Sequence, residues 1–353
     1  MSDELNIESP GIKKDKILCI GCDVGTGTLQ VARSDQDTVK ITRNVFLELS
    51  KDEITTSDLS NISYVENEGR IFIVGNDAFR LANIFSKEVS RPMEFGLISA
   101  REVSSIDVIT VMIQELIGDV KDKQVYLTYS VPAESVDGGR SIIYHERVFA
   151  RVFAALGLNY TSMNEGMAII YSECEKENFS GIGISFGAGL CNVAFSYKKV
   201  EAFKFSTSRS GDYIDKQVAE SLNMVKNRVT AIKEKNFDIQ IGFDNEPNKK
   251  IKRVLESLTY YYQAMIEYSI KKLIDEFHEK IDIELEEPVP IILSGGTSLP
   301  NGFLELYKTI LSGYQMPFAI SEVRRAKNPL TSVAEGLLKK TLQDVKNKNI
   351  FDQ

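Results

Sequence analysis

The sequence predicts an α/β fold made of two similar halves, and three observations support this. Apolar strand-like runs alternate with segments that carry apolar residues at helical spacing. The 353 residues exceed the usual size of one domain and suggest two domains or one large divided domain. Glycine-rich turns follow apolar strands at residues 21–28 and 185–189, separated by about half the chain.

The first half reads mainly as strands followed by helices. Strands are expected at residues 17–22, 38–48, 61–74, with Glu68-Gly69 as a turn, and 124–131, which stops at Pro132. Helices are expected at residues 103–117 and at 145–156, where Gly157 is a natural C-terminal stop.

The second half continues the pattern. Residues 181–196 read as strand, turn and strand, residues 251–281 as a long helix, 290–293 as a buried strand and 332–345 as a last helix. The cluster Tyr260-Tyr261-Tyr262 is interpreted as core or interface filler, because aromatics within helices usually pack.

Composition excludes several classes of function. Only His145 and His278 are present, so a multi-histidine zinc site cannot be built, and a Ser-His-Asp hydrolase would have to use one of the two. The net charge of −8, without a dense basic tract, argues against a nucleic-acid surface. Four cysteines without framework spacing indicate a reducing cytoplasm, and Cys19-x-x-Cys22 is interpreted as strand packing.

The ends of the chain carry no targeting signal in this interpretation. Residues 1–15 are polar and are expected to form a disordered lead, because a signal peptide would have an apolar core. No apolar run approaches the ~20 residues that span a bilayer, and no amphipathic N-terminal helix is seen, so no direct membrane anchor is expected.

The glycine-rich turns can bind phosphate. Missing side chains let backbone N–H groups approach an anion closely, and the hydroxyls of Thr26 and Thr28 add possible contacts. Asp23, at a strand end, can hold Mg²⁺ through water. Each turn alone is weak evidence, since hairpins also use glycine. Together they suggest two halves that clamp a nucleotide between them.

Further motifs carry a resemblance. Asp23-Val24-Gly25-Thr26 is similar to the first phosphate motif D-x-G-T of the actin and chaperone ATPase superfamily, and Val131-Pro132-Ala133 to its VPA strand end. Residues 164–168 resemble its NEP-x-A segment, and residues 184–193 stand at its second phosphate motif. Within the superfamily, residues 91–98 and 328–336 resemble the RP-x-x-x-G-x-I and DPLT-x-VA-x-G runs of the bacterial actins MreB and MamK.

The resemblance implies a duplicated, ribonuclease H-like fold with two lobes around a nucleotide cleft. It implies a first lobe over residues 16–165 with a small insertion at about 46–91, and a second lobe over 166–325 with an insertion at about 206–259. A C-terminal helix, 326–353, would return to the first lobe. ATP or ADP with Mg²⁺ would be held by Asp23 as metal ligand and by a set of nucleotide-binding residues: Gly25, Thr26, Gly27, Thr28, Gly187, Ala188, Gly189, Gly211, Asp212, Lys233, Glu234, Gly295, Gly296 and Thr297.

Two positions depart from the superfamily pattern. Ser185 stands where the second motif opens with Asp, and Leu190 where it ends with Thr. One carboxylate fewer should weaken Mg²⁺ binding and slow phosphoryl transfer, although a degenerate loop that binds no nucleotide is an alternative. Glu146 is the candidate that orients the attacking water, and a solvated glutamate at a helix start is an equal alternative.

The leading hypothesis is a cytoplasmic actin-like protein that binds ATP and polymerises with itself. A weak ATPase activity would be coupled to polymerisation, with protein adaptors as further partners. The alternative is a non-hydrolysing adaptor of the same fold, similar to FtsA or PilM, which Ser185 favours. A sugar kinase of the same superfold ranks last, because no sugar-binding carboxylate is recognised.

Overall fold

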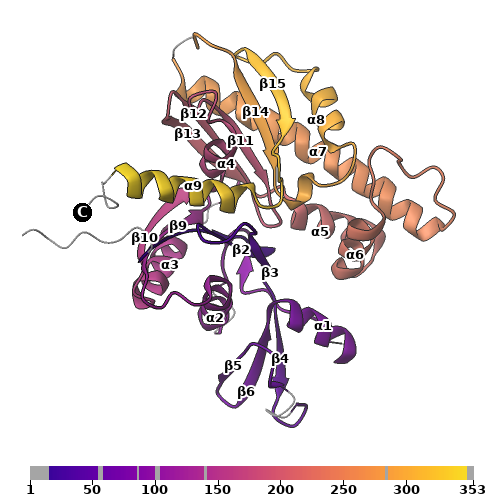
Figure 1. Cartoon of the computed structure of the whole chain (residues 1–353). Helices are drawn as coiled ribbons and strands as arrows, with labels where there is room; N and C mark the ends of the chain where they lie inside the picture. The colour runs from indigo at the N-terminus through magenta and orange to yellow at the C-terminus, as the bar shows by residue number, and fades with distance from the viewer. Residues whose placement is uncertain are drawn as a thin grey trace, which may run out of the picture.

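The computed structural model describes residues 16–54, 59–85, 87–99, 104–138, 141–282 and 285–347. The predicted lead, residues 1–15, lies outside the described residues. Figure 1 shows two α/β lobes, each built on a five-stranded sheet, with the first sheet in indigo to magenta and the second in magenta to yellow.

The first sheet has the order β10-β9-β1-β2-β3. Its central strand β1 (Ile17–Val24) pairs antiparallel with β2 (Thr28–Arg33), which pairs with β3 (Lys40–Arg43). On its other side β1 pairs in parallel with β9 (Gln124–Val131), and β9 with β10 (Asn159–Asn164). The helices α2 (Ser105–Ile117) and α3 (Ile143–Ala155) belong to this lobe.

The second sheet repeats this arrangement. Its central strand β11 (Gly181–Phe186) pairs antiparallel with β12 (Cys191–Tyr197), which pairs with β13 (Val200–Thr207). On the other side β11 pairs in parallel with β14 (Val289–Ser294), and β14 with β15 (Ile320–Arg325). Each lobe thus has an antiparallel meander of three strands, extended by two strands in parallel. This repetition confirms the duplicated two-lobed fold.

Each lobe carries an insertion of a different kind. The first contains the sheet β4-β6-β5, from β4 (Phe46–Ser50), β5 (Tyr64–Asn67) and β6 (Arg70–Val74), followed by α1 (Gly75–Phe85). The second is helical in its described part, with α5 (Gly211–Leu222), α6 (Lys226–Asn236) and the start of α7 (Lys249–Lys280).

The expected single strand at residues 38–48 is two strands in different sheets. β3 pairs with β2, whereas β4 pairs with β6. Asn44 lies between them and is fully buried, and its backbone N–H donates to the carbonyl of Gly27 at 3.0 Å. This tertiary hydrogen bond turns the chain where the local pattern predicts continuation.

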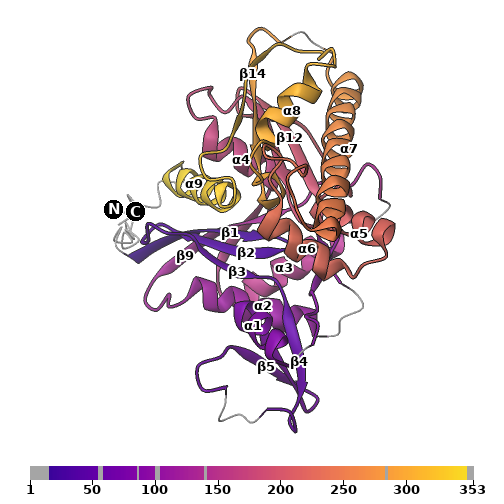
Figure 2. The ribbon, with the colours of Figure 1, turned by 90° about the vertical axis from the view of Figure 1, so that its right-hand side faces the viewer.

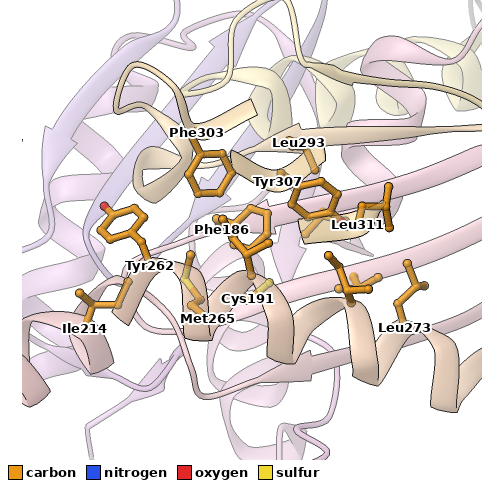
Figure 3. Packing of buried hydrophobic residues seen from close by; sticks show 14 of the residues in the cluster. Phe186, Cys191, Ile214, Tyr262, Met265, Leu273, Leu293, Phe303, Tyr307 and Leu311 are labelled. Carbon is orange, nitrogen blue, oxygen red and sulfur yellow. The ribbon is translucent and has the colours of Figure 1, made fainter. Parts of the chain in front are cut away.

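The largest core lies in the second lobe. In Figure 3 the rings of Phe186, Phe303, Tyr307 and Tyr262 gather between the end of β11, α8 (Phe303–Leu311) and α7. The tyrosine cluster is therefore only partly core filler. Tyr262 is 1% exposed and fills the core, whereas Tyr260 is 66% exposed. All four cysteines are free and buried, in agreement with a packing role.

Two helices lie between the sheets. Figure 2 shows α4 (Glu165–Glu173) and α9 (Ser332–Asn347) side by side, with α9 next to the first sheet. A side chain at Gly336 would overlap the carbonyl of Ala168, so glycine permits this close approach. The hydroxyl of Thr341 donates to the carbonyl of Ile20 at 3.0 Å, which fixes α9 on β1. Among the described helices, none has both the length and the apolar character to cross a membrane.

Candidate functional site

A cleft of about 510 Å³ opens between the lobes. Its volume is in the range of small-molecule sites. The expected metal ligand and all expected nucleotide-binding residues line it: Asp23, Gly25, Thr26, Gly27, Thr28, Gly187, Ala188, Gly189, Gly211, Asp212, Lys233, Glu234, Gly295, Gly296 and Thr297. The structure therefore brings together residues that are spread over more than 270 positions of the sequence.

Two hairpin turns, one from each lobe, form the centre of the cleft. We call residues 25–28, between β1 and β2, the first turn, and residues 187–190, between β11 and β12, the second turn. The N–H of Gly25 donates to the carbonyl of Thr28 at 3.1 Å, and that of Gly187 to Leu190 at 3.0 Å. A Cβ at either glycine would lie 2.8 Å from the accepting oxygen, so the same geometry excludes a side chain at the first glycine of each turn.

The two turns approach each other closely. A Cβ at Gly27 would lie 3.0 Å from the methyl group of Ala188, and one at Gly189 would overlap the hydroxyl of Thr26. Small residues on both sides are therefore required for the lobes to come this near. Backbone donors from two lobes that face one cleft can together surround a phosphate chain.

Two carboxylates lie behind the first turn, Asp23 buried and Glu165 half-buried. Asp23 is 8% exposed and accepts a hydrogen bond from the hydroxyl of Ser130 at 2.8 Å. Burial raises its pKa to about 6, although the Ser130 hydrogen bond opposes the change. Burial and the charge of Asp23 raise the pKa of Glu165 to about 8. A cation beside these two carboxylates would favour their charged forms, which burial disfavours.

Glu165 is a site residue that sequence reasoning missed. It begins α4, where the buried side chain of Asn164 caps the helix by accepting from the N–H of Gly166 at 2.9 Å. Its carboxylate lies near the side chains of Ser185 and Asn192 in the cleft, and these polar groups oppose the rise of its pKa. The available signal was the likeness of residues 164–168 to the NEP-x-A segment, which the site assignment did not use.

The second turn is held by two neighbouring segments, residues 210–211 and 295–297. The carbonyl of Gly187 accepts from the hydroxyl of Ser210 at 2.5 Å, from that of Thr297 at 2.7 Å and from the N–H of Gly211 at 3.2 Å. Gly295 has φ +90° and its Cβ would overlap the backbone of Phe186. These contacts join the three glycine segments of the second lobe into one wall of the cleft.

Six charged residues that line the cleft form ion pairs with one another. Lys233 contacts Asp215 at 2.7 Å, and Asp215 is 2% exposed. Glu234 pairs with Arg43 of the first lobe at 3.3 Å. Arg91, also of the first lobe, reaches both carboxylate oxygens of Asp212 at 2.8 Å. The last two pairs cross from lobe to lobe.

Glu146 does not join the cleft. It lies near the N-terminus of α3, away from the residues that line the cleft. Its carboxylate accepts a hydrogen bond from the hydroxyl of Ser162 on β10 at 2.9 Å. The helix packs Val148, Phe149 and Phe153 into the first core, and this rotation directs Glu146 toward β10. This geometry keeps Glu146 out of the cleft, so the water-orienting role stays a prediction that the structure does not support, and the alternative of a solvated glutamate at the helix start stays open.

Duplicated lobes with paired glycine turns around one cleft define an actin-like fold, and comparisons with known proteins agree. The volactin family model matches residues 18–340, so the chain belongs to the volactin family. No curated protein matches the chain.

Solved structures show the same fold. The MamK double helical filament is similar at 20% identity and a TM-score of 0.68, over 92% of this chain and 98% of that one. MreB5 of Spiroplasma citri bound to ADP is similar at 14% identity and a TM-score of 0.64, over 96% and 100%. EutJ from Carboxydothermus hydrogenoformans is similar at 16% identity and a TM-score of 0.50, over 93% of each chain. The predicted likeness to MreB and MamK is confirmed.

Proposed function

We propose that this chain binds ATP or ADP with Mg²⁺ in the cleft between its lobes and polymerises into filaments. The observation that carries the proposal is the pair of glycine turns that face each other from two lobes. MreB5, which has a similar fold, binds ADP, and a non-polymerising MamK mutant binds AMPPNP. Both support a nucleotide as the ligand.

The phosphates would lie between the two turns. The N–H groups of Gly27 and Gly189 and the hydroxyls of Thr26 and Thr28 are the donors of this region. The second turn supplies Ala188 and Leu190 in place of hydroxyls, so its contribution is backbone only. Lys233, Glu234 and the segment Gly295–Thr297 would flank the adenosine at the far end of the cleft.

Asp23 and Glu165 fit a magnesium ion. The described residues hold no group of three or more His, Cys, Asp or Glu side chains arranged as a metal site. Mg²⁺ is commonly held by one or two carboxylates together with waters and substrate phosphates, so two carboxylates suffice when nucleotide is present. When bound, the ion would neutralise phosphate charge, while Ser130 and Ser185 orient the two carboxylates.

Charge along the second lobe supports head-to-tail association. Residues 226–253 contain eight basic and four acidic side chains, whereas residues 275–287 contain seven acidic side chains and one lysine. The 32-residue helix α7 joins these two regions. This distribution opposes the helix dipole, which favours acidic residues at the N-terminus and basic ones at the C-terminus. Contact between the basic region of one copy and the acidic region of the next would compensate this unfavourable charge distribution. Repeated head-to-tail contacts of this kind build an open filament.

Hydrolysis is expected to be slow, because Ser185 carries no charge where the superfamily has Asp. Electron microscopy and light scattering with ATP and Mg²⁺ test polymerisation, and calorimetry tests binding. Filaments that form only with ATP and weaken at high salt are expected. Tight nucleotide binding without filaments at tens of micromolar would instead favour the FtsA-like or PilM-like adaptor, and no binding at all would contradict both.

A further inference from the structure

The segment 91–98 lies between the two lobes, and we call it the strap. It contains the short hairpin β7 (Met93–Glu94) and β8 (Leu97–Ile98), closed by the N–H of Ser99 donating to Pro92 at 2.9 Å. Its start is fixed to the first insertion, because Ser90 and Phe46 exchange backbone hydrogen bonds of 2.8 and 2.9 Å. The strap is therefore a defined element of the first lobe.

One end of the strap holds the second lobe through charge. Arg91 contacts both carboxylate oxygens of Asp212 at 2.8 Å, and Lys226 contacts one of them at 2.9 Å. The pair is partly shielded, with side-chain exposures of 32% for Arg91 and 20% for Asp212. The charges of Arg91 and Lys226 hold the pKa of Asp212 below its usual range even though burial opposes this. Asp212 is thus ionised and engaged.

The other end of the strap lies against both turns. The N–H of Gly96 donates to the hydroxyl of Thr26 in the first turn at 3.0 Å. A Cβ at Gly96, which has φ +75°, would overlap the side chain of Leu190 in the second turn. Leu190 stands where the superfamily pattern has Thr, so an apolar contact with the strap occupies the place of a polar group.

Both contacts of the strap with the second lobe depend on the second turn. Leu190 belongs to that turn, and the N–H of Asp212 donates to the carbonyl of Ala188 at 2.8 Å. A displacement of the turn would therefore move both contacts together. A network of packed and hydrogen-bonded groups with this continuity can transmit a local change to lobe closure.

The charged pairs also separate two cavities. Arg91, Asp212, Arg43 and Glu234 line both the cleft and a second cavity of about 750 Å³ between α1 and the helices α5 and α6. Opening of the two pairs would join the cavities into one wide entrance to the cleft. The pairs thus lie across a route that a nucleotide would take.

We propose that the strap is a latch: it holds the lobes closed through Arg91 and Asp212, and it must release for a nucleotide to enter or leave. Because Gly96 contacts both turns, a ligand that moves the turns would also move the strap. The nucleotide part rests on the proposed function of the cleft, whereas the latch itself is a statement about lobe closure alone.

Lobe closure can be measured without nucleotide. Spin labels at Asp52→Cys in the first insertion and Lys250→Cys in α7 report the distance between the lobes, because both positions are exposed and the native cysteines are buried. We expect one narrow distance distribution, which Arg91→Gln shifts to longer distances and broadens. Arg91→Lys, which keeps the charge, should fall between the two.

The matched control is Arg80→Gln, which removes an arginine that pairs with Asp77 within α1 and crosses no lobe boundary. It should leave the distribution unchanged. A distribution in Arg91→Gln identical to that of the parent would overturn the latch, provided that its circular dichroism shows a folded protein, and Arg91→Lys offers the same test if Arg91→Gln does not fold.

Nucleotide kinetics then test the gating. Dissociation of a fluorescent ADP analogue from Arg91→Gln should be about tenfold faster, which corresponds to about 1.4 kcal/mol, and Arg80→Gln should match the parent. Equal rates in parent and Arg91→Gln would overturn the gating. If neither protein binds the analogue, the proposed function of the cleft fails, and the spin-label distances still decide whether the strap is a latch.

Discussion

The two turns can be compared position by position, from Asp23 to Thr28 in the first lobe and from Ser185 to Leu190 in the second. Their backbones are alike, with closing hydrogen bonds of 3.1 and 3.0 Å and the same exclusion of a Cβ at the first glycine. Their side chains differ at every polar position, because Ser185, Ala188 and Leu190 replace Asp23, Thr26 and Thr28.

The difference separates two kinds of contribution. Backbone geometry follows from glycine and from pairing of the central hairpin, which both lobes keep. Between the two turns, the carboxylate of Asp23 and the hydroxyls of Thr26 and Thr28 belong to the first alone, and Glu165 at the junction of the lobes is the second carboxylate. The second turn is instead fixed by neighbouring segments, because the carbonyl of Gly187 accepts three hydrogen bonds. We infer an asymmetric site in which the first lobe supplies chemistry and the second supplies shape.

The largest expected effect is on the charge of the first turn. Asp23→Asn keeps the shape and removes the charge, so Mg²⁺-dependent affinity for ATP should fall about 100-fold, in line with losses at metal sites. Calorimetry with and without Mg²⁺ measures this. Ser185→Ala is the matched change in the second lobe and should cost less than about twofold. Equal losses in the two variants would contradict the asymmetry.

Stability should depend on pH through the same carboxylates. The folded state raises the pKa of Glu165 to about 8 and that of Asp23 to about 6, so it binds more protons than the unfolded chain. The contribution of these two carboxylates to the free energy of unfolding is therefore fully present at low pH and is lost as pH rises through these values. Between pH 6.5 and 9 in EDTA we expect a loss of about 2 kcal/mol in urea unfolding.

Two controls define this pH profile. Glu165→Gln should flatten it, and Mg²⁺ with ATP should do the same in the parent by stabilising the charged carboxylates. Burial lowers the pKa of His145 to about 4, so that residue destabilises the fold as pH falls below about 6.5. Burial also raises the thiol pKa of all four cysteines, which adds to the loss near pH 9, so the carboxylate effect is cleanest between about pH 6.5 and 8. A parent profile that stays flat in EDTA would show that the two carboxylates are not desolvated together.

Close approach of the turns gives the next effect. Gly189→Ala would drive a methyl group into the hydroxyl of Thr26, whereas Gly27→Ala meets only the methyl group of Ala188 at 3.0 Å. We expect Gly189→Ala to cost about 1.5 kcal/mol more in thermal unfolding, the usual scale of overpacking. Affinity for nucleotide should fall in the same order. Equal destabilisation would indicate that the lobes are farther apart in solution.

How much of this was predictable from sequence depends on the distance over which each contact forms. The turns are local, since glycines after an apolar strand specify them directly, and all of their predicted residues line the cleft. Glu165 was missed because its environment arises where α4 meets Asp23 and Ser185 from two sheets. Glu146 lies outside the cleft because the packing of α3, and not its position after VPA, sets the direction of its side chain. Asn44 ends a predicted strand through a tertiary hydrogen bond.

The smallest effect is expected from Ser185→Asp, which restores the carboxylate that the second lobe lacks. Ser185→Asp would place a third carboxylate beside Glu165, where Ser185 is 3% exposed. Without Mg²⁺ the added charge should lower the melting temperature, because like charges in a buried site repel. With Mg²⁺ and ATP it should increase phosphate release about tenfold, since phosphoryl transfer depends on positioning and on neutralisation of charge. Ser185→Asn has nearly the same size without the charge and should produce neither change. Phosphate release that stays at the parent rate in Ser185→Asp, with Mg²⁺ bound more tightly, would show that the second lobe limits hydrolysis by shape and not by its missing carboxylate.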